Sequence, residues 1–258
     1  MVKKVYNILK VVFVEDIFNV KINVLENVDL DIIYMIQEKI KNNISVTDQE
    51  INYFLNYLCF EVRKKLSLKK SKEVKDNLFT NQCDTAQSMI YYYLNELGVL
   101  TIPVNTNDVL GPVTGHSFVL AFINGEYYLI DPTYNQFFDL RKCSKDNFVV
   151  IKEKVSIAPA PGYFVSMYSL EDKKKIIDFL KNGFMKVSSD NLRLYGDSFY
   201  KTKTGVNMDF SETASIPSSH YLKWFLNSNS KLSKTVEDLE EENLLIKPLN
   251  TKNNVKKV

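Results

Sequence analysis

Three residues of this chain have side chains suited to covalent catalysis by a thiol. Cys83 offers a sulfur nucleophile, His116 a base, and Asp131 a carboxylate, in that order along the chain. A thiol attacks a carbonyl group as its thiolate, a neighbouring imidazole moves protons, and a carboxylate holds that imidazole in one tautomer. These residue types indicate nucleophilic catalysis if the fold brings them together.

The segment around Cys83 predicts an amphipathic helix that begins close to the thiol. Asn81 is a favourable N-cap for a helix over 82–97, and Gly98 suits its C-terminal end. Cys83 shares the apolar face of this helix with Ala86, Met89, Ile90, Tyr93, Leu94 and Leu97. The helix dipole and the unpaired N–H groups of the first turn favour a thiolate there. We expect the thiol to point towards a sheet that this face covers.

The sequence HSFVLAFINGEYYLIDPTYNQFF, residues 116–138, predicts a β-hairpin that carries the other two groups. Asn124-Gly125 is a strong two-residue turn signal, because both turn positions need a positive φ. This turn pairs Ile123 with Glu126, and the same register makes His116 and Asp131 diagonal neighbours on one face, within reach of a hydrogen bond. Both strands are apolar on both faces, which predicts an interior position in the sheet. The preceding segment, 99–104, predicts another strand.

Helices are expected in the first eighty residues. One covers 29–42, with an apolar face formed by Ile32, Ile33, Ile36 and Ile40. The next begins with a capping box of Thr47 and Glu50 and carries an apolar stripe that includes Cys59. We therefore expect Cys59 to be an inert core thiol.

Helices are also expected in the last third of the chain. One is capped by Ser169 and closed by Gly183, and shorter ones cover about 189–200 and 218–228. No repeat or linker interrupts the chain. We expect one α+β domain over 1–250, with a helical part (1–80), a catalytic core (77–140), a second helical part (165–247) and a frayed tail (251–258).

Three short stretches carry a resemblance to a known superfamily. They are Asn81-Gln82-Cys83-Asp84, Gly115-His116-Ser117 and Tyr128-Leu129-Ile130-Asp131-Pro132-Thr133. Over about residues 77–140 the chain resembles the papain-like and transglutaminase-like cysteine enzymes, which include papain-fold domains of bacterial toxins and effectors. The resemblance implies a helical lobe whose nucleophile helix packs on a short antiparallel sheet, and a Cys83, His116 and Asp131 triad.

The resemblance also bears on the oxyanion hole. Papain-like peptidases place a Gln six residues before the nucleophile, where this chain has Asn77. Gln82 is the other candidate side chain, and the backbone N–H of Cys83 is a third donor.

The composition argues against several other classes of protein. With 33 basic and 31 acidic side chains the net charge is +2, too balanced to indicate nucleic-acid binding. Eight glycines form neither a dinucleotide fingerprint nor a P-loop, and three cysteines with two histidines form no zinc motif. We expect no cofactor and no metal.

The N-terminal sequence bears on location. Lys10, Glu15 and Asp16 interrupt its apolar run and no cleavage site follows, unlike a signal peptide. No stretch has the length and apolarity of a membrane span. We expect a cytoplasmic protein, or one secreted without a cleaved signal.

A basic run from Arg63 to Lys75 contains seven basic residues and one acid, Glu73. It is either a solvated helix end and linker or a patch that binds an acidic partner or anionic lipid.

The leading functional hypothesis is an enzyme that acts on protein amide bonds through an acyl thioester. The acceptor of the acyl group, water or an amine, would then decide between peptidase, glutamine deamidase and transglutaminase activity. The alternatives are a catalytically silent papain-like module that binds a partner, and a small-molecule acyltransferase. The residues alone do not choose among them.

Overall fold

The computed structural model describes residues 28–70, 82–106, 116–134, 169–203 and 218–250. Within these ranges it contains seven helices: α2 (Leu30–Lys41), α3 (Asp48–Lys70), α4 (Cys83–Glu96), α8 (Leu170–Asn182), α9 (Ser189–Lys203), α11 (Ser218–Leu226) and α12 (Val236–Glu241). The four strands are β1 (Leu100–Asn105), β2 (Ser117–Ile123), β3 (Glu126–Ile130) and β4 (Phe184–Lys186). The expected α+β class is confirmed.

The strands form one open antiparallel sheet in the order β1-β2-β3-β4. Ile123 pairs with Glu126, and the turn residues Asn124 and Gly125 have φ values of 53° and 85°. The predicted hairpin register and the interior position of its two strands are confirmed. The expected strand over 99–104 is β1, displaced by one residue, whereas the three-residue strand β4 was not predicted.

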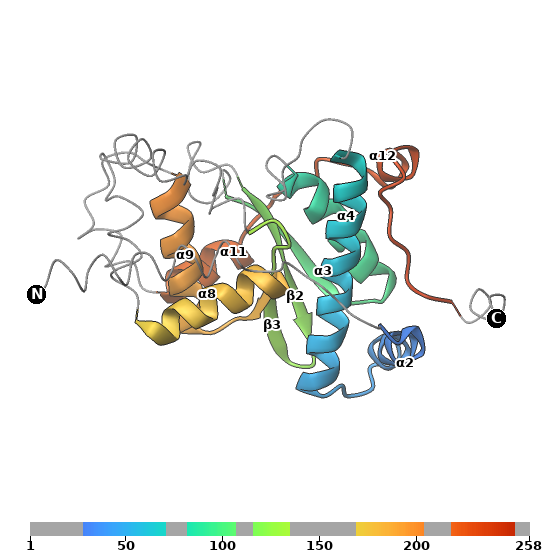
Figure 1. The fold of residues 1–258 in the computed structure, drawn as a ribbon, viewed down its shortest axis with the longest axis horizontal. Coiled ribbons are helices and arrows are strands. Elements are labelled where there is room, and N and C mark those ends of the chain that lie inside the picture. Colours follow the sequence, from blue (N-terminus) through green and yellow to red (C-terminus); the bar gives the residue numbers. More distant parts are fainter. Residues whose placement is uncertain (1–27, 71–81, 107–115, 135–168, 204–217, 251–258) are drawn as a thin grey trace, which may run out of the picture.

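Helices cover both faces of the sheet, and Figure 1 shows α3 and α4 on one side with α8, α9 and α11 on the other. Alternate residues of the central strands belong to two separate apolar clusters, one on each face of the sheet. Val119, Ala121 and Ile130 belong to the cluster that includes side chains of α2, α3, α4 and α12. Phe118, Leu120 and Leu129 belong to the cluster that includes side chains of α8, α9 and α11. Because both faces are buried, the central strands lack the polar alternation of a half-exposed sheet.

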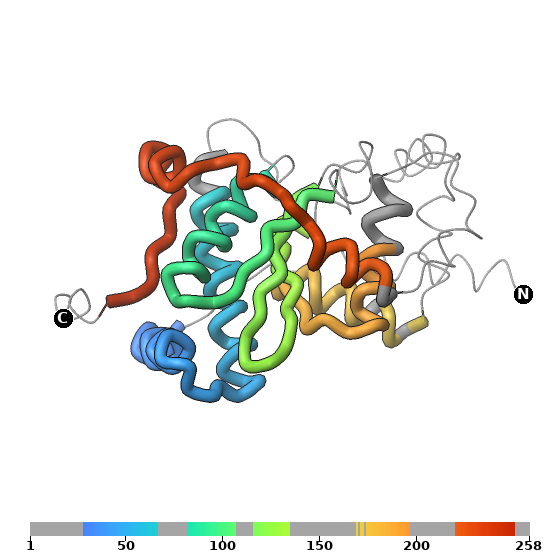
Figure 2. The backbone as a smooth tube through the Cα atoms, turned by 180° about the vertical axis from the view of Figure 1, so that it is seen from behind, coloured from blue at the N-terminus to red at the C-terminus, as the bar shows by residue number. Residues whose placement is uncertain are grey.

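The chain passes from one helical layer to the other after α11. Figure 2 shows this segment running from α11 towards α12, past the end of β1. Along it the Ser230 hydroxyl accepts a hydrogen bond from the backbone N–H of Asn105, and the Lys234 carbonyl accepts one from the Tyr92 hydroxyl. The segment therefore links the sheet edge to the outer side of α4.

The N-terminal helices agree with the sequence except at Ile32. Thr47 and Glu50 exchange both hydrogen bonds of the predicted capping box, and Cys59 is fully buried. Ile33 and Ile36 are fully buried, but Ile32 is 40% exposed, so its expected place on the buried face is wrong. Since α2 packs mainly on α3, only a narrow stripe of α2 is covered.

The C-terminal helices follow the expected boundaries closely. Ser169 and Asp172 form a capping box, and Gly183 ends α8 with a φ of 78°. The helices expected over 189–200 and 218–228 are α9 and α11. None of the described helices has the length and apolarity needed to cross a membrane. The tail over 251–258 lies outside the described residues.

Candidate functional site

His116 and Asp131 lie at the same end of the two central strands. His116 directly precedes β2 and Asp131 directly follows β3. Because these strands are antiparallel neighbours, the two positions meet, and Nε2 of His116 lies 2.7 Å from Oδ2 of Asp131. Both side chains are completely buried. The hydrogen bond expected from the hairpin register is present.

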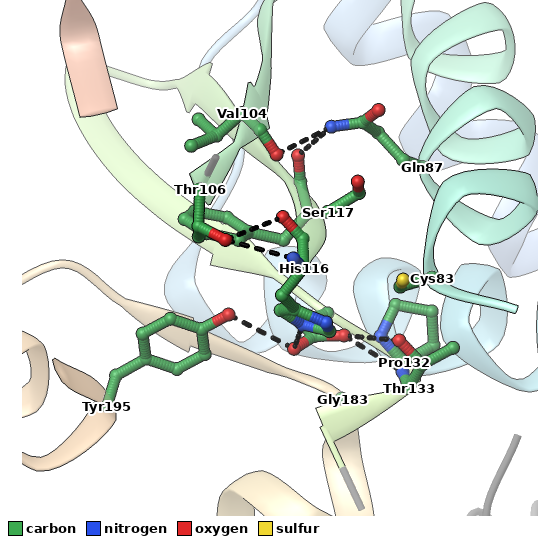
Figure 3. Close-up of polar contacts among 12 residues, drawn as sticks. Cys83, Gln87, Val104, Thr106, His116, Ser117, Pro132, Thr133, Gly183 and Tyr195 are labelled. Carbon is green, nitrogen blue, oxygen red and sulfur yellow. Dashed lines mark hydrogen bonds and ion pairs between the residues drawn. The ribbon is translucent and has the colours of Figure 1, made fainter. Parts of the chain in front are cut away.

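The Asp131 carboxylate has hydrogen-bonding partners on both oxygens. Oδ1 accepts from the backbone N–H and the hydroxyl of Thr133, at 3.0 and 2.8 Å. Oδ2 accepts from the Tyr195 hydroxyl at 3.2 Å, in addition to its contact with His116 (Figure 3). The backbone N–H of Asp131 donates to the Gly183 carbonyl at 2.7 Å. These partners compensate the burial of the carboxylate and fix its orientation.

The backbone of His116 is held by Thr106, which follows β1. The Thr106 N–H donates to the His116 carbonyl and the His116 N–H donates to Oγ1 of Thr106, both at 2.9 Å. Oγ1 also donates to the same carbonyl at 3.2 Å. His116 is thus fixed at its backbone by the neighbouring strand end and at its ring by Asp131 (Figure 3).

The surroundings of His116 favour its charged form. Burial would lower the pKa of His116, but the charge of Asp131, the hydrogen bond with Asp131, and the hydrogen bond and charge of Cys83 together raise this pKa to about 9. An imidazole in this setting carries a proton at neutral pH and has a buried counter-ion.

Cys83 is the first residue of α4, and its side chain lies on the side of the helix that faces His116 (Figure 3). The residue is 9% exposed. Asn81 was the expected N-cap, which is wrong: the helix begins at Cys83 and Gln82 occupies the cap position, without a side-chain hydrogen bond to the helix. This start places the thiol one residue closer to the positive end of the helix than expected.

A second carboxylate lies beside the thiol. Oδ1 of Asp84 accepts a hydrogen bond from Sγ of Cys83 at 3.7 Å and one from the hydroxyl of Ser117. The negative charge of Asp84 opposes a thiolate, whereas an imidazolium at His116 favours one. Asp84 had no expected role from the sequence.

Gln87 fastens α4 to the sheet one turn after Cys83. Its Nε2 donates to the backbone carbonyls of Val104 and Phe118, both at 2.8 Å, and the side chain is buried (Figure 3). These carbonyls belong to paired residues of β1 and β2. Gln87 therefore sets the height of α4, and of Cys83, over the strand that follows His116.

Arg63 supports the site from α3. Its three guanidinium nitrogens donate to the carbonyls of Pro132, Leu180 and Lys181, at 2.7, 3.0 and 2.6 Å respectively. Burial lowers the pKa of Arg63 to about 10, while the charges of Cys59 and Asp131 oppose that shift. Arg63 thus joins the turn after Asp131 to the end of α8, where a cation also complements the helix dipole.

Both interpretations of the basic run are wrong for Arg63, which is neither solvated nor on a binding patch. It follows Cys59 by four residues and lies on the same buried face of α3. Residues 71–75 of the run lie outside the described residues, so binding of an acidic partner stays a prediction.

The candidate oxyanion groups are placed only in part. Gln82 and the backbone N–H of Cys83 lie at the start of α4, and Asn77 lies outside the described residues. Within the described part of the chain, no three His, Cys, Asp or Glu side chains group closely enough to hold a metal ion.

No protein-family model matches this chain, and neither curated proteins nor solved structures give a match. The chemistry of the site is therefore the basis for a functional conclusion.

Proposed function

We propose that this protein is a papain-like cysteine enzyme that acts on amide bonds of proteins or peptides, with Cys83 as nucleophile, His116 as acid and base, and Asp131 as orienting group. The observation that carries the proposal is the buried ion pair of His116 and Asp131, 2.7 Å long, beside a cysteine at a helix start. The packing of α4 over the antiparallel sheet of the described residues agrees with the resemblance.

The first half of the reaction forms an acyl thioester. The thiolate of Cys83 attacks the carbonyl carbon, the C–N bond breaks, and the leaving amine takes a proton from His116. Since Nε2 of His116 is bonded to Asp131, Nδ1 is the nitrogen through which this proton would pass. The backbone N–H of Cys83, with Gln82 or Asn77, would donate to the oxyanion.

The second half returns the enzyme to its starting state. His116 accepts a proton from water or from an amine as that acceptor attacks the thioester, and the carbon–sulfur bond breaks to release the thiolate. Water gives hydrolysis or deamidation, and an amine gives a cross-link. His116 is neutral between the two steps, and the negative charge of Asp131 stabilises the imidazolium that forms again when His116 accepts this proton.

One observation favours a second candidate, a catalytically silent binding module of the same fold. Asp84 accepts a hydrogen bond from Cys83, and an acidic neighbour stabilises the unreactive thiol form. In such a module the His116–Asp131 pair would be purely structural. A small-molecule acyltransferase has no corresponding observation in its favour.

The experiment is incubation of the protein with a proteome, with and without a labelled primary amine. Cleaved peptides, glutamines one dalton heavier, or incorporated amine would identify a peptidase, a deamidase or a transglutaminase. Cys83→Ala should abolish the product, and Cys59→Ala serves as the matched control because that thiol is fully buried and donates to the Gly183 carbonyl. No product from a folded protein that binds a proteome component would favour the silent module.

A further inference from the structure

A tyrosine from the opposite helical layer completes the surroundings of Asp131. The hydroxyl of Tyr195, on α9, donates to Oδ2 of Asp131 at 3.2 Å. The same oxygen contacts Nε2 of His116. Figure 3 shows the Tyr195 phenol and the His116 imidazole extending from different elements towards the same point. Two donors thus share one carboxylate oxygen.

The Tyr195 ring has little freedom to leave this position. It is 1% exposed, and its ring stacks on Tyr134 at a centroid distance of 5.6 Å and makes edge contacts with Phe118 at 5.2 Å and Phe179 at 5.7 Å. The next residue, Gly196, has no room for a side chain, since a Cβ would lie 2.7 Å from the Tyr221 ring. Tight packing on both sides fixes where the hydroxyl points.

The Tyr195 phenol remains a donor over the whole physiological range. Burial, followed by the charge of Asp131, raises the pKa of Tyr195 well above its ordinary value of 10. A neutral phenol next to a carboxylate donates its only proton to that carboxylate. Its hydrogen bond withdraws part of the charge that Oδ2 presents to His116.

We infer that Tyr195 is a positioning residue that orients the Asp131 carboxylate and limits how tightly it retains the proton on His116. This inference rests on the proposed function for its catalytic meaning, because an acid must release its proton to the leaving amine. The effect of the Tyr195 hydrogen bond on the proton of His116 does not depend on that function. The contact between Tyr195 and Asp131 arises from tertiary packing, since α9 is separated from Asp131 by 58 or more residues.

Removal of the hydroxyl leaves the other ionisable neighbours of the pair in place. They are Cys83 on α4, which contributes to the pKa of His116, and Cys59 and Arg63 on α3, which interact with the charge of Asp131. With Tyr195→Phe, Oδ2 therefore has only His116 as a side-chain donor among its described contacts. The carboxylate should then hold the imidazolium more strongly.

The test is a pH titration followed by nuclear magnetic resonance of protein labelled with ¹⁵N-histidine. The chain has two histidines, so the spectrum contains signals from His116 and His220 alone. His220 is exposed and distant in sequence from the pair, and it serves as an internal reference. Tyr195→Phe should move the His116 midpoint upward by about half a pH unit or more, given the usual strength of hydrogen bonds to charged groups.

Tyr93→Phe is the matched control. Tyr93 is also fully buried, and its hydroxyl accepts a hydrogen bond from Gln37 rather than contacting the site. Tyr93→Phe should leave the His116 midpoint unchanged at a comparable loss of melting temperature. In an Asp131→Asn background, Tyr195→Phe should lose its effect on that midpoint.

Two results would overturn the inference. One is a His116 midpoint that is unchanged or lowered in Tyr195→Phe. The other is an upward shift that persists in the Asp131→Asn background. If the His116 midpoint rises in Tyr195→Phe but the proteome experiment gives no product, the proposed function is refuted and the role of Tyr195 stands. If product forms but the midpoint does not rise, the role of Tyr195 is refuted and the proposed function stands.

Discussion

The two cysteines in the described residues carry the same thiol group, but their surroundings differ. Cys59 is fully buried, its Sγ donates to the Gly183 carbonyl at 3.5 Å, and burial raises its pKa to about 12. Cys83 begins a helix and lies beside an imidazole whose pKa is raised. At the scale of single residues, neighbours rather than residue type separate an inert thiol from a candidate nucleophile.

Substitution of the proposed triad should order its members by role. Asp131→Asn retains shape and hydrogen bonding but loses charge, so it should retain measurable activity; Asp131→Ala should retain less. Because Cys83 and His116 can form an ion pair without the carboxylate, the loss in Asp131→Asn should be smaller than the roughly 10⁴-fold loss seen when the serine-protease triad loses this charge. His116→Ala and Cys83→Ala should retain essentially none.

Activities of the four variants are compared on protein shown to be folded by circular dichroism and melting temperature, because Asp131 also anchors the turn at Thr133. If folded His116→Ala were as active as Asp131→Asn, the base would have to be another residue.

The His116–Asp131 pair should also make stability depend on pH. The pKa of His116 is raised in the folded state to about 9 from an ordinary value of 6.5. A raised pKa stabilises the fold fully below pH 6.5, and this contribution is lost as pH rises towards 9. The loss should be on the order of 3 kcal/mol of unfolding free energy.

Urea unfolding between pH 6 and 9 measures this dependence. The comparison is Cys83→Ala with and without His116→Gln, because the titration of Cys83, which His116 influences, is then absent from both proteins. Equal slopes of unfolding free energy against pH in the two proteins would show that His116 is not held as an imidazolium.

At the scale of elements, the local sequence predicted features that depend on neighbouring residues, such as the hairpin register. Asn124-Gly125 predicted the hairpin register, and with it the contact of His116 with Asp131, because a two-residue turn leaves one pairing. Thr133 ended the stretch Tyr128–Thr133 that carries the resemblance, but it had no assigned partner. The predicted start of α4 was one residue too early, because Asn81 is a better N-cap than Gln82 by propensity alone.

The supporting residues could not be predicted because they act across elements. Tyr195 reaches Asp131 from a helix in the other layer, and no local pattern marks it. Arg63 offered a partial signal, since a charged residue stood on the apolar stripe of α3 four residues after Cys59. Its partners at the end of α8 depend on tertiary packing.

Two glycines at helix ends give a test of how closely these elements pack around the site. Gly98 and Gly183 have φ values of 74° and 78°. A Cβ at Gly98 meets nothing within 4 Å, whereas one at Gly183 lies 3.0 Å from Nη2 of Arg63 and from Cα of Pro132. Gly98→Ala should cost about 1–2 kcal/mol of backbone strain, and Gly183→Ala about 2–5 kcal/mol because overpacking is added.

Denaturant unfolding measures the loss of unfolding free energy in both glycine variants. The proton signals of His116 show whether the geometry of the site has changed. Gly183→Ala should perturb those signals, because the Gly183 carbonyl accepts from the Asp131 N–H. Equal unfolding costs for the two glycine variants would mean that α8 does not pack against the site as described.

At the scale of the whole molecule, the candidate site lies where two helical layers meet one end of the sheet. Cys83 belongs to α4 in one layer, Tyr195 belongs to α9 in the other, and His116 and Asp131 lie at the ends of the strands between them. Each layer has its own apolar cluster. The geometry of the site therefore depends on both layers being docked on the same sheet.

The rate at which iodoacetamide alkylates Cys83 in folded protein, measured as a function of pH, shows whether His116 activates this thiol. Mass spectrometry follows all three thiols, with Cys59 as the buried control and Cys143, outside the described residues, as a second reference. We expect fast, selective alkylation of Cys83 at pH 6, and its loss at that pH in folded His116→Ala. Alkylation of Cys83 at pH 6 that is equally fast without His116, or faster alkylation of Cys143, would contradict this expectation.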